Sequence, residues 1–423
     1  MEEKRTLRIL FIGNSHTYFN DMPAMVAEKA RKAGFDCEVT MIAHGGWYLE
    51  QHVQEPDVRF NILYGHYDYV VLQEFSHPFG PEEKFFGAVR TLNQWIREAG
   101  SKPVIYMTWA RKEEKEVQPR MTAANKQIAE EIGATFIIAN DPDADRLSVG
   151  VKHNGEWFQI SGNDMAAILA DWVSRKYTLD REHGSYMVRS AVSSRFIDAL
   201  GKAKGIEVYE TLTGFKWIGN KALELRRAGK QCLMTYEEAI GFTVGDMSFD
   251  KDGVRLAVCF ASLVLEWAQQ GKDLVDVLED LGKTYGYFVQ NNKYYFCYDP
   301  DKLVTIFNKM RCDGKHIWKF GRFEVEAIRD LTVGYDSTQK DNKPILPVSK
   351  STQMITYTFK NGCIATLRGS GTEPKLKYYI EMAGKPGVAK EDVKKELMEL
   401  SHVLLQTCLE PEANGLIPPK TEE

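Results

Sequence analysis

The sequence predicts an α/β protein in which an N-terminal doubly wound parallel sheet continues into further α/β domains, and the chain ends in an α+β domain. Short apolar strand patterns alternate with helix patterns from residue 7 to residue 132, an order typical of parallel sheets. Near the end of the chain, strand patterns at residues 362–367 and 376–382 flank a Gly-rich turn. At 423 residues, the length suggests roughly three domains.

The composition argues against several classes of partner. The net charge is −5, from 54 basic and 59 acidic residues, which gives no indication of nucleic-acid or anionic-membrane binding. Seven scattered cysteines without a Cys-x-x-Cys pair favour a reducing compartment. The N-terminus lacks the apolar run of a signal peptide, and the apolar residues 254–268 are too few for a membrane span. We therefore expect a cytoplasmic protein of unknown oligomeric state that binds a small molecule.

The first third of the chain gives the parallel sheet its elements. Apolar and β-branched runs predict strands, and Pro in a first turn or Gly after a last turn bounds a helix. The expected strands are 7–12, 37–42, 69–72 and 104–108, and the expected helices are 23–33, 83–99 and 119–132. Ligand sites in such sheets lie at the carboxyl ends of the strands.

Polar and glycine residues stand at those strand ends: Ser15, the pair Gly45 and Gly46, and Gln73. In these positions the region resembles the SGNH (GDSL-type) hydrolases, a family of esterases and carbohydrate deacetylases. The resemblance implies that Ser15 is the catalytic nucleophile and that Gly45, Gly46 and Gln73 belong to the oxyanion hole, whose donors stabilise a developing negative charge. A plain helix cap is the alternative role for Ser15.

An SGNH hydrolase also needs an Asp-x-x-His block that supplies the general base. The sequence changes character before such a block appears, and Asp180 with His183 has the required spacing only further along the chain. His16, His44 and His77 are nearer to Ser15 in sequence.

Residues 138–147 read IANDPDADRL and place Asp141, Asp143 and Asp145 at alternate positions after an apolar strand. Carboxylates with this spacing in a turn can converge on one hard cation. An EF-hand loop is excluded, because it needs Gly at its sixth position and Glu at its twelfth, where this chain has Arg146 and Lys152. A solvated acidic turn is the remaining alternative.

This turn closely resembles the magnesium loop of the α-D-phosphohexomutases, the phosphoglucomutase and phosphomannomutase superfamily, and the resemblance extends to the C-terminal region. It implies that Mg²⁺ is the cofactor and that Asp141, Asp143 and Asp145 are its ligands. Residues 134–139 fit the next strand of either family, so that one sheet could continue across the junction. The expected domains are 1–137 (partial SGNH hydrolase-like), 138–185 (remainder of the metal-binding domain), 186–300 (sugar-binding) and 301–423 (C-terminal phosphate-binding).

Further loops match the mutases in order and narrow the resemblance to the phosphoglucomutase-2-like branch, which includes phosphopentomutases and glucose 1,6-bisphosphate synthases. The sequence TGFKW matches an active-site loop and makes Lys216 a catalytic candidate, while Ala239 stands where hexose-specific members carry Ser. In the sequence RGSGTEP, glycines on both sides of a serine let backbone N–H groups turn toward a dianion. The implied substrate-binding residues are Arg146, Glu237, Glu238, Lys251, Arg368, Ser370, Gly371, Thr372 and Lys377.

The phosphoserine loop of these mutases, Thr-Ala-Ser-His-Asn-Pro, does not occur in the chain. Phosphoryl transfer needs a donor in line with the cations that neutralise its charge. The sequence therefore predicts a phosphosugar mutase with impaired turnover. The alternatives are an SGNH-type serine esterase and a non-catalytic, Mg²⁺-dependent phosphosugar-binding fusion.

Overall fold

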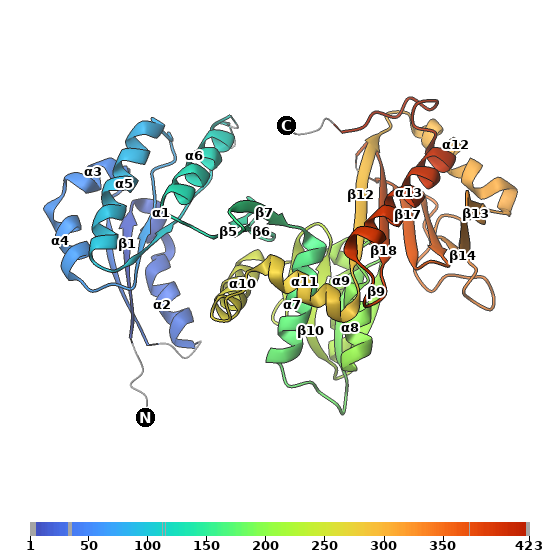
Figure 1. Ribbon diagram of the computed structural model, residues 1–423, viewed down its shortest axis with the longest axis horizontal. Helices are drawn as coiled ribbons and strands as arrows, with labels where there is room; N and C mark the ends of the chain where they lie inside the picture. Colours follow the sequence, from blue (N-terminus) through green and yellow to red (C-terminus); the bar gives the residue numbers. More distant parts are fainter. Residues whose placement is uncertain (1–5, 33–35, 112, 115, 372, 420–423) are drawn as a thin grey trace. The chain divides into compact units, whose positions relative to one another are not determined.

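The structure is a computed structural model that describes residues 6–32, 36–111, 113–114, 116–371 and 373–419 (Figure 1). Contacts within the chain divide it into two compact units, Met1–Thr135 and Phe136–Glu423. The predicted α/β fold class is confirmed. The expected boundaries at residues 185 and 300, inside the second unit, stay predictions.

The first unit is a parallel four-stranded sheet with the order β2-β1-β3-β4. Apolar residues of β1 alternate between two cores: Leu10 and Ile12 face the larger one, and Ile9 and Phe11 face a smaller one that includes Ala27. Helices thus cover both faces, as the doubly wound pattern predicts. The elements are β1 (Leu7–Gly13), α1 (Ser15–Tyr18), η1 (Phe19–Asp21), α2 (Met22–Lys32), β2 (Cys37–Ala43), α3 (Leu49–Gln54), α4 (Pro56–Tyr64), β3 (Tyr69–Leu72), α5 (Glu82–Glu98), β4 (Lys102–Ile105) and α6 (Val117–Glu131).

The strand at the junction does not extend this parallel sheet. β5 (Phe136–Asn140) pairs antiparallel with β6 (Leu147–His153), and β6 pairs with β7 (Glu156–Ile160) in a separate three-stranded sheet. A short turn closes each hairpin, so local antiparallel pairing costs little chain entropy compared with a crossover to a distant strand. The idea of one continuous sheet is therefore wrong.

The middle of the second unit is a four-stranded sheet with the order β11-β10-β8-β9. Every residue of β8 (Ser185–Ser190) is buried, because apolar clusters pack on both faces of the sheet. The other elements are α7 (Gly162–Lys176), α8 (Phe196–Lys204), β9 (Glu207–Thr211), α9 (Phe215–Arg227), β10 (Gln231–Glu237), β11 (Gly241–Val244), α10 (Gly253–Ala268) and α11 (Leu274–Tyr285). The parallel strands β8, β9 and β10 end at the same edge, where polar loops gather.

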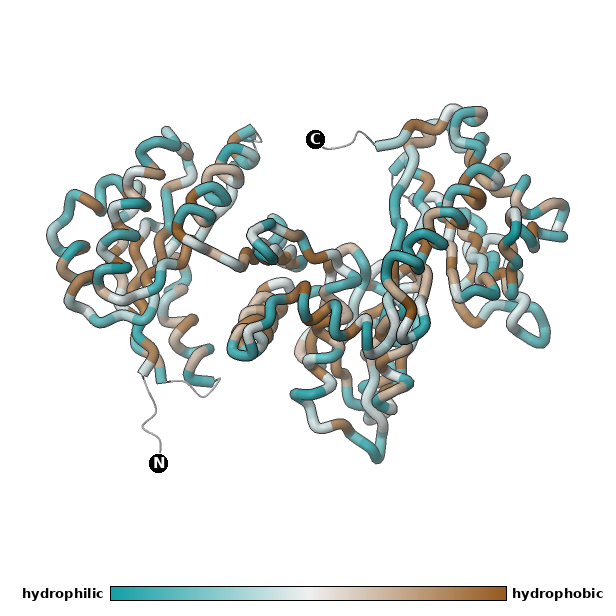
Figure 2. The backbone as a smooth tube through the Cα atoms, in the orientation of Figure 1, coloured by the Kyte–Doolittle hydropathy of each residue, from teal (hydrophilic) through white to brown (hydrophobic). Residues whose placement is uncertain are grey.

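The C-terminal part is an antiparallel sheet with one buried face, ordered β12-β18-β17-β16-β14-β13, with β15 beside β14. Residues of β18 (Lys375–Ala383) are alternately buried and half-buried, and the buried ones pack on two helices. Figure 2 colours the chain by hydropathy, and both apolar (brown) and polar (teal) stretches occur in this part. The other elements are β12 (Phe288–Phe296), α12 (Pro300–Arg311), η2 (Cys312–Gly314), β13 (Lys319–Phe320), β14 (Phe323–Asp330), β15 (Tyr335–Asp336), β16 (Met354–Phe359), β17 (Cys363–Gly369) and α13 (Lys390–Leu409). This part confirms the expected α+β ending.

Among the described residues, no helix combines the length and the apolar character that a membrane crossing requires.

Candidate active site

The acidic turn lies between β5 and β6, and its three carboxylates do not converge as the spacing predicts. Asp141 accepts hydrogen bonds from the backbone N–H of Arg146 at 3.0 Å and from Arg146 Nη1 at 3.4 Å. Asp145 Oδ2 pairs with Lys251 Nζ at 3.2 Å, and Asp143 is exposed. Cations within reach neutralise two of the carboxylates separately, which is why the side chains diverge.

The donor set nevertheless fits a hard cation. Asp145 Oδ1 is buried and has no hydrogen-bond partner within the described residues, and an unpaired buried carboxylate oxygen is costly without a ligand. Three aspartates supply the all-oxygen ligands that Mg²⁺ prefers. Asp141, Asp143 and Asp145 would hold the ion, which would neutralise charge on phosphoryl oxygens.

Lys251 brings separate loops of the second unit together. Its Nζ lies 3.2 Å from Asp145 in the acidic turn, 3.1 Å from Asp250 and 5.3 Å from the ring centre of Phe215 in the TGFKW loop. Burial alone would lower the pKa of Lys251, but the two carboxylates outweigh burial and raise it. A charged ammonium group is thus held between the acidic turn and the start of α9. Lys216, the next residue of that loop, is exposed.

Glu237 ends β10, Glu238 follows it, and the two carboxyl groups differ in their surroundings. Burial, with Glu238 beside it, raises the pKa of Glu237 to about 6. Glu238 Oε2 accepts hydrogen bonds from the hydroxyls of Ser190 at 3.1 Å and Ser193 at 3.2 Å. A side chain at Gly162 would collide with the Glu238 carbonyl, so the first turn of α7 packs directly on this loop. The loop, residues 237–241, is called the sugar loop below.

The RGSGTEP loop joins β17 to β18. The backbone N–H of Ser370 donates to the carbonyl of Lys375 at 2.8 Å, and Gly371 is exposed. Lys377 Nζ lies 3.7 Å from Glu373 Oε2. Thr372 lies outside the described residues. The serine backbone and one lysine are thus already fixed by neighbours in the loop.

Tyr379, on β18, has a pKa that depends on charges of both this loop and the sugar loop. Burial raises the pKa of Tyr379, the nearby carboxylates of Glu238 and Glu237 raise it further, and the Arg368 guanidinium lowers it. Charged groups of both loops therefore act on the pKa of this phenol.

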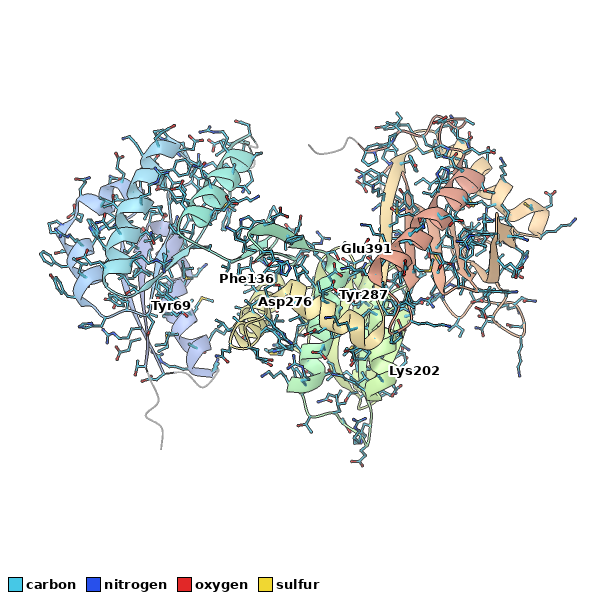
Figure 3. The ribbon with its side chains drawn as sticks, in the orientation of Figure 1. Tyr69, Phe136, Lys202, Asp276, Tyr287 and Glu391 are labelled. Atoms are coloured by element: carbon cyan, nitrogen blue, oxygen red, sulfur yellow. The ribbon has the colours of Figure 1, made fainter. Side chains whose placement is uncertain are left out.

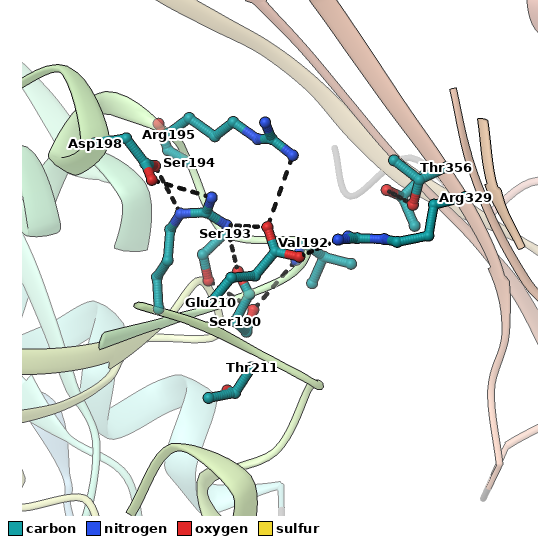
Figure 4. Close-up of polar contacts among 12 residues, drawn as sticks. Ser190, Val192, Ser193, Ser194, Arg195, Asp198, Glu210, Thr211, Arg329 and Thr356 are labelled. Carbon is teal, nitrogen blue, oxygen red and sulfur yellow. Dashed lines mark hydrogen bonds and ion pairs between the residues drawn. The ribbon is translucent and has the colours of Figure 1, made fainter. Parts of the chain in front are cut away.

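A buried ionic network behind the sugar loop escaped the sequence analysis (Figure 4). Arg189, which is 3% exposed, donates from Nε to Asp198 at 2.7 Å and pairs with Glu210 at 3.0 Å. Arg329 of β14 pairs with the other oxygen of Glu210 at 2.5 Å. Burial would raise the pKa of Glu210, but Arg189 and Arg329 outweigh it and hold the pKa low. Glu210 thereby joins β9 to the C-terminal sheet. The residues are far apart in sequence, and no spacing predicts their contact.

One acidic cluster has a structural role. Among the described residues, His153, Asp273 and Asp276 form the group of three possible ligands whose ligand atoms lie within 4.8 Å of one another. Asp273 caps α11 by accepting from the N–H groups of Val275 and Asp276, and it also accepts from His153 Nδ1–H at 2.7 Å. Asp276, labelled in Figure 3, completes the capping box by accepting from the N–H of Asp273. The cluster stabilises a helix start.

In the first unit, Ser15 begins α1 directly after β1. Within the described residues, no hydrogen bond joins Ser15 to a histidine. Asn14, not Ser15, caps the helix by accepting from the N–H of His16 at 3.2 Å. The alternative capping role for Ser15 is therefore wrong.

The residues expected in the oxyanion hole lie in different environments. Gly45 and Gly46 form the turn after β2, and Gly46 has a φ of +76°. Gln73 is fully buried, and its Oε1 accepts from the N–H of Asn14 at 3.1 Å and from the hydroxyl of Thr17 at 3.0 Å. Its amide nitrogen donates to the Glu74 carbonyl. The Gln73 amide group thus binds the backbone after β1 and after β3 in this conformation, and its role in an oxyanion hole stays a prediction.

Asp180 and His183, which have the spacing of the missing base, lie in the turn before β8 of the second unit. Asp180 Oδ1 accepts from the backbone N–H groups of Glu182 and His183, and its Oδ2 lies 3.2 Å from His183 Nδ1. These contacts of both side chains lie within that turn.

Known proteins are similar in sequence to the part of the chain that contains these loops. Residues 161–285 match the family described as phosphoglucomutase/phosphomannomutase, alpha/beta/alpha domain III. The chain is 42% identical over 301 residues to the phosphopentomutase of Homo sapiens, a match that spans 69% of this chain and 49% of that protein. Glucose 1,6-bisphosphate synthase of Mus musculus is 40% identical over 300 residues, with 69% and 48% covered. The probable phosphoribomutase of Schizosaccharomyces pombe is 38% identical over 296 residues, with 68% and 49% covered.

The chain therefore spans about half the length of the curated relatives it matches. Among solved structures, the open form of the phosphoglucomutase pp63/parafusin from Paramecium is similar in fold, with a TM-score of 0.53 at 14% identity over 92% of this chain and 65% of that one. The region that the sequence matches cover, about two thirds of the chain, is therefore similar to phosphomutases, and residues 161–285 carry the match to the phosphoglucomutase/phosphomannomutase domain.

Proposed function

We propose that this chain is a phosphosugar mutase module that binds a sugar monophosphate with Mg²⁺ in the second unit. The observation that carries the proposal is the position of Lys251, which touches the acidic turn and the TGFKW loop together. Loops far apart in sequence converge on one ammonium group, at the shared end of parallel strands where ligands of α/β sheets bind.

The charged and polar residues of the proposed site have separate roles. Arg368, Ser370, Gly371, Thr372 and Lys377 anchor the phosphate that does not react, because a guanidinium, an ammonium group, hydroxyls and the N–H of the exposed Gly371 bind a dianion well. Glu237 accepts hydrogen bonds from sugar hydroxyls, with Glu238 supporting it from behind. Arg146, Lys216 and Lys251 neutralise charge at the phosphate to be transferred.

Magnesium belongs to this proposal. The unpaired, buried Asp145 Oδ1 favours a cation beside Lys251. The relatives named phosphopentomutase and phosphoribomutase, together with Ala239 in the sugar loop, support a pentose phosphate as the substrate.

The test is a calorimetric titration of the chain with ribose 5-phosphate in the presence of Mg²⁺. Replacing Arg368 by Ala removes a charged hydrogen bond, which is worth about 1.5–3 kcal/mol, so affinity should fall roughly 10- to 150-fold. Arg322→Ala is the matched control, because Arg322 pairs with Glu399 at the surface of the same sheet. Equal affinity of Arg368→Ala and the control would refute the proposal.

Metal dependence is tested separately. Asp143→Asn should weaken the binding of Mn²⁺, used as a paramagnetic probe, without changing the melting temperature, because Asp143 is exposed. Unchanged binding of Mn²⁺ would remove the metal from the proposal and leave the phosphate loop untouched.

A further inference from the structure

We infer that a second small-molecule site lies behind the sugar loop, and that it takes an uncharged, hydroxyl-rich molecule of monosaccharide size. The site is a cavity of about 530 Å³, within the range of roughly 300–1,000 Å³ that small-molecule sites occupy. It is called the rear cavity below. Its walls come from the first turn of α7, the end of α11, the first residues of β12 and Lys390 at the start of α13.

Side-chain amides make one wall rigid. Asn163 Nδ2 donates to Gln290 Oε1 at 2.6 Å, and Asn163 Oδ1 accepts from the N–H of Ser194 at 2.9 Å. Gln290 Nε2 donates to Glu381 at 3.0 Å. Because each amide is held by a second partner, its orientation is fixed before any ligand arrives, and little entropy is lost on binding.

Asp164 offers an acceptor for a ligand hydroxyl. Its Oδ2 accepts from the hydroxyl of Ser161 at 2.6 Å, while its other oxygen has no hydrogen-bond partner in the part of the chain that the structure describes. Burial raises the pKa of this carboxyl group. A neutral donor such as a sugar hydroxyl satisfies that oxygen in either protonation state.

The charges of the rear cavity exclude an anionic ligand. Two carboxyl groups, of Asp164 and Glu238, line it. Lys390 Nζ is already paired with Glu279 at 2.9 Å, and the other oxygen of Glu279 accepts from the hydroxyl of Tyr287 at 3.0 Å; Tyr287 is labelled in Figure 3. A phosphate would meet like charge and a cation already neutralised. The site therefore differs in chemistry from the RGSGTEP loop.

The remaining wall is apolar. Phe196, Leu278, Leu281 and Phe288 line the cavity and present the flat carbon surface that packs on the C–H face of a sugar ring. Hydroxyl partners on one side and aromatic rings on the other favour a monosaccharide over a purely apolar ligand.

The rear cavity shares a wall with the candidate active site. Glu238 lines the cavity, its carboxylate is bonded by Ser190 and Ser193, and its neighbour Glu237 faces the proposed substrate. The close packing of Gly162 on the Glu238 carbonyl links α7 to the same loop. Occupancy of the rear cavity should therefore change the affinity for sugar phosphate, and the coupling must be reciprocal.

The experiment is a ligand-observed NMR titration of the full chain with D-ribose and D-glucose, each without phosphate. Lys390→Trp places a bulky ring at the mouth of the rear cavity, where the lysine side chain is 50% exposed, so the fold should tolerate it. Lys394→Trp, one turn along α13 and exposed, is the matched control. We expect saturable binding of at least one sugar, weakened tenfold or more in Lys390→Trp and unchanged in Lys394→Trp.

Asp164→Asn is a second test variant, because it retains the shape of the side chain and changes its hydrogen bonding. Binding of the unphosphorylated sugar should weaken in this variant too. Failure of both sugars to bind, or equal binding by Lys390→Trp and Lys394→Trp, would overturn the inference. Ribose 5-phosphate should bind equally well to both tryptophan variants. Its binding depends on the RGSGTEP loop and is tested by Arg368→Ala, so the rear cavity and the proposed function can fail independently.

Discussion

Glu74 follows β3 at the carboxyl edge of the first unit, where a single residue controls how stability depends on pH. It is 8% exposed, and its oxygens accept from the N–H groups of Phe75 at 2.7 Å and Leu49 at 3.3 Å. Burial outweighs these bonds and raises the pKa of Glu74 from 4.5 to about 7. The native state therefore holds this proton more tightly than the unfolded state does.

The sign of the effect follows from proton linkage. The contribution of Glu74 to stability is present below about pH 4.5 and is lost as the pH rises to about 7, by on the order of 3 kcal/mol. Burial also lowers the pKa values of His52 and His16, which acts in the opposite direction below their usual pKa. We predict that Glu74→Gln flattens the loss of stability between pH 5 and 8.

Urea denaturation at several pH values measures this prediction. The slopes of Glu74→Gln and the parent chain are compared, so that the two histidines cancel. Glu50→Gln is the control, because Glu50 is exposed and pairs with Lys84 at the surface. Parallel pH profiles for the parent and Glu74→Gln would contradict the assigned pKa.

Arg189 shows the cost of a buried charge left without its partner. It neutralises Asp198 and Glu210 together. Arg189→Met should destabilise the second unit by about 3–5 kcal/mol, as for removal of one partner of a buried ion pair. Arg195→Met is the matched comparison, because Arg195 is 33% exposed and lies 3.7 Å from Glu210; it should cost about 1 kcal/mol or less. Chemical denaturation measures both, and equal losses would show that burial does not decide the effect.

Among the elements, α7 depends on a glycine at its first position. Ser161 caps the helix by accepting from the N–H of Asp164, and Gly162 permits the close approach to Glu238. We predict that Gly162→Ala pushes the sugar loop away, costs about 1–3 kcal/mol of stability and weakens binding of ribose 5-phosphate. Gly87→Ala is the control, because Gly87 lies in α5 with open space around it and should gain stability. Calorimetric melting and titration measure both variants, and intact binding by Gly162→Ala would argue against the contact.

The elements that the sequence predicted correctly are those with strong local patterns. The strands of the first unit and the strands around the RGSGTEP loop begin and end within a few residues of expectation, because apolar alternation and glycine turns are local signals. The β5–β6 hairpin was missed as a pairing, since a strand pattern does not reveal which neighbour the strand will choose.

The site was predictable to the same degree. Motifs predict Asp145, Glu237, Lys251 and Arg368 as site residues of the second unit; Asp145 and Lys251 lie in loops, whereas Glu237 and Arg368 lie at the ends of β10 and β17. Motifs did not reveal that Lys251 forms an ion pair with Asp145 of the acidic turn. They also did not reveal that the Gln73 amide group is hydrogen-bonded to the backbone. Those outcomes depend on side-chain contacts between distant segments, which spacing along the chain does not contain.

At the scale of the whole molecule, the proposed substrate-binding loops belong to one unit. The acidic turn, the sugar loop, Lys251 and the RGSGTEP loop all lie within residues 136–423. Lys251 pairs with Asp145, and a backbone bridge joins Arg146 to Gly241 of the sugar loop. The geometry of the proposed site is therefore set within the second unit, by its sheets and the ionic network around Glu210. Substitutions in the first unit, such as Ser15→Ala, should leave binding of sugar phosphate unchanged.

Binding and turnover should separate in this chain. In the proposed function Arg368, Ser370 and Lys377 anchor a phosphate, and Lys216 and Lys251 neutralise charge, but none of these groups carries a phosphoryl group that it could donate. The phosphoserine loop implied by the family resemblance does not occur among the 423 residues. We predict that the purified chain binds ribose 5-phosphate with Mg²⁺ and does not convert it to ribose 1-phosphate, even when a sugar bisphosphate is added as a primer. Phosphorus NMR follows both isomers directly, with the human phosphopentomutase as a positive control. Formation of the second isomer, together with phosphate trapped on a serine and located by mass spectrometry, would contradict the prediction and identify the residue that replaces the missing donor.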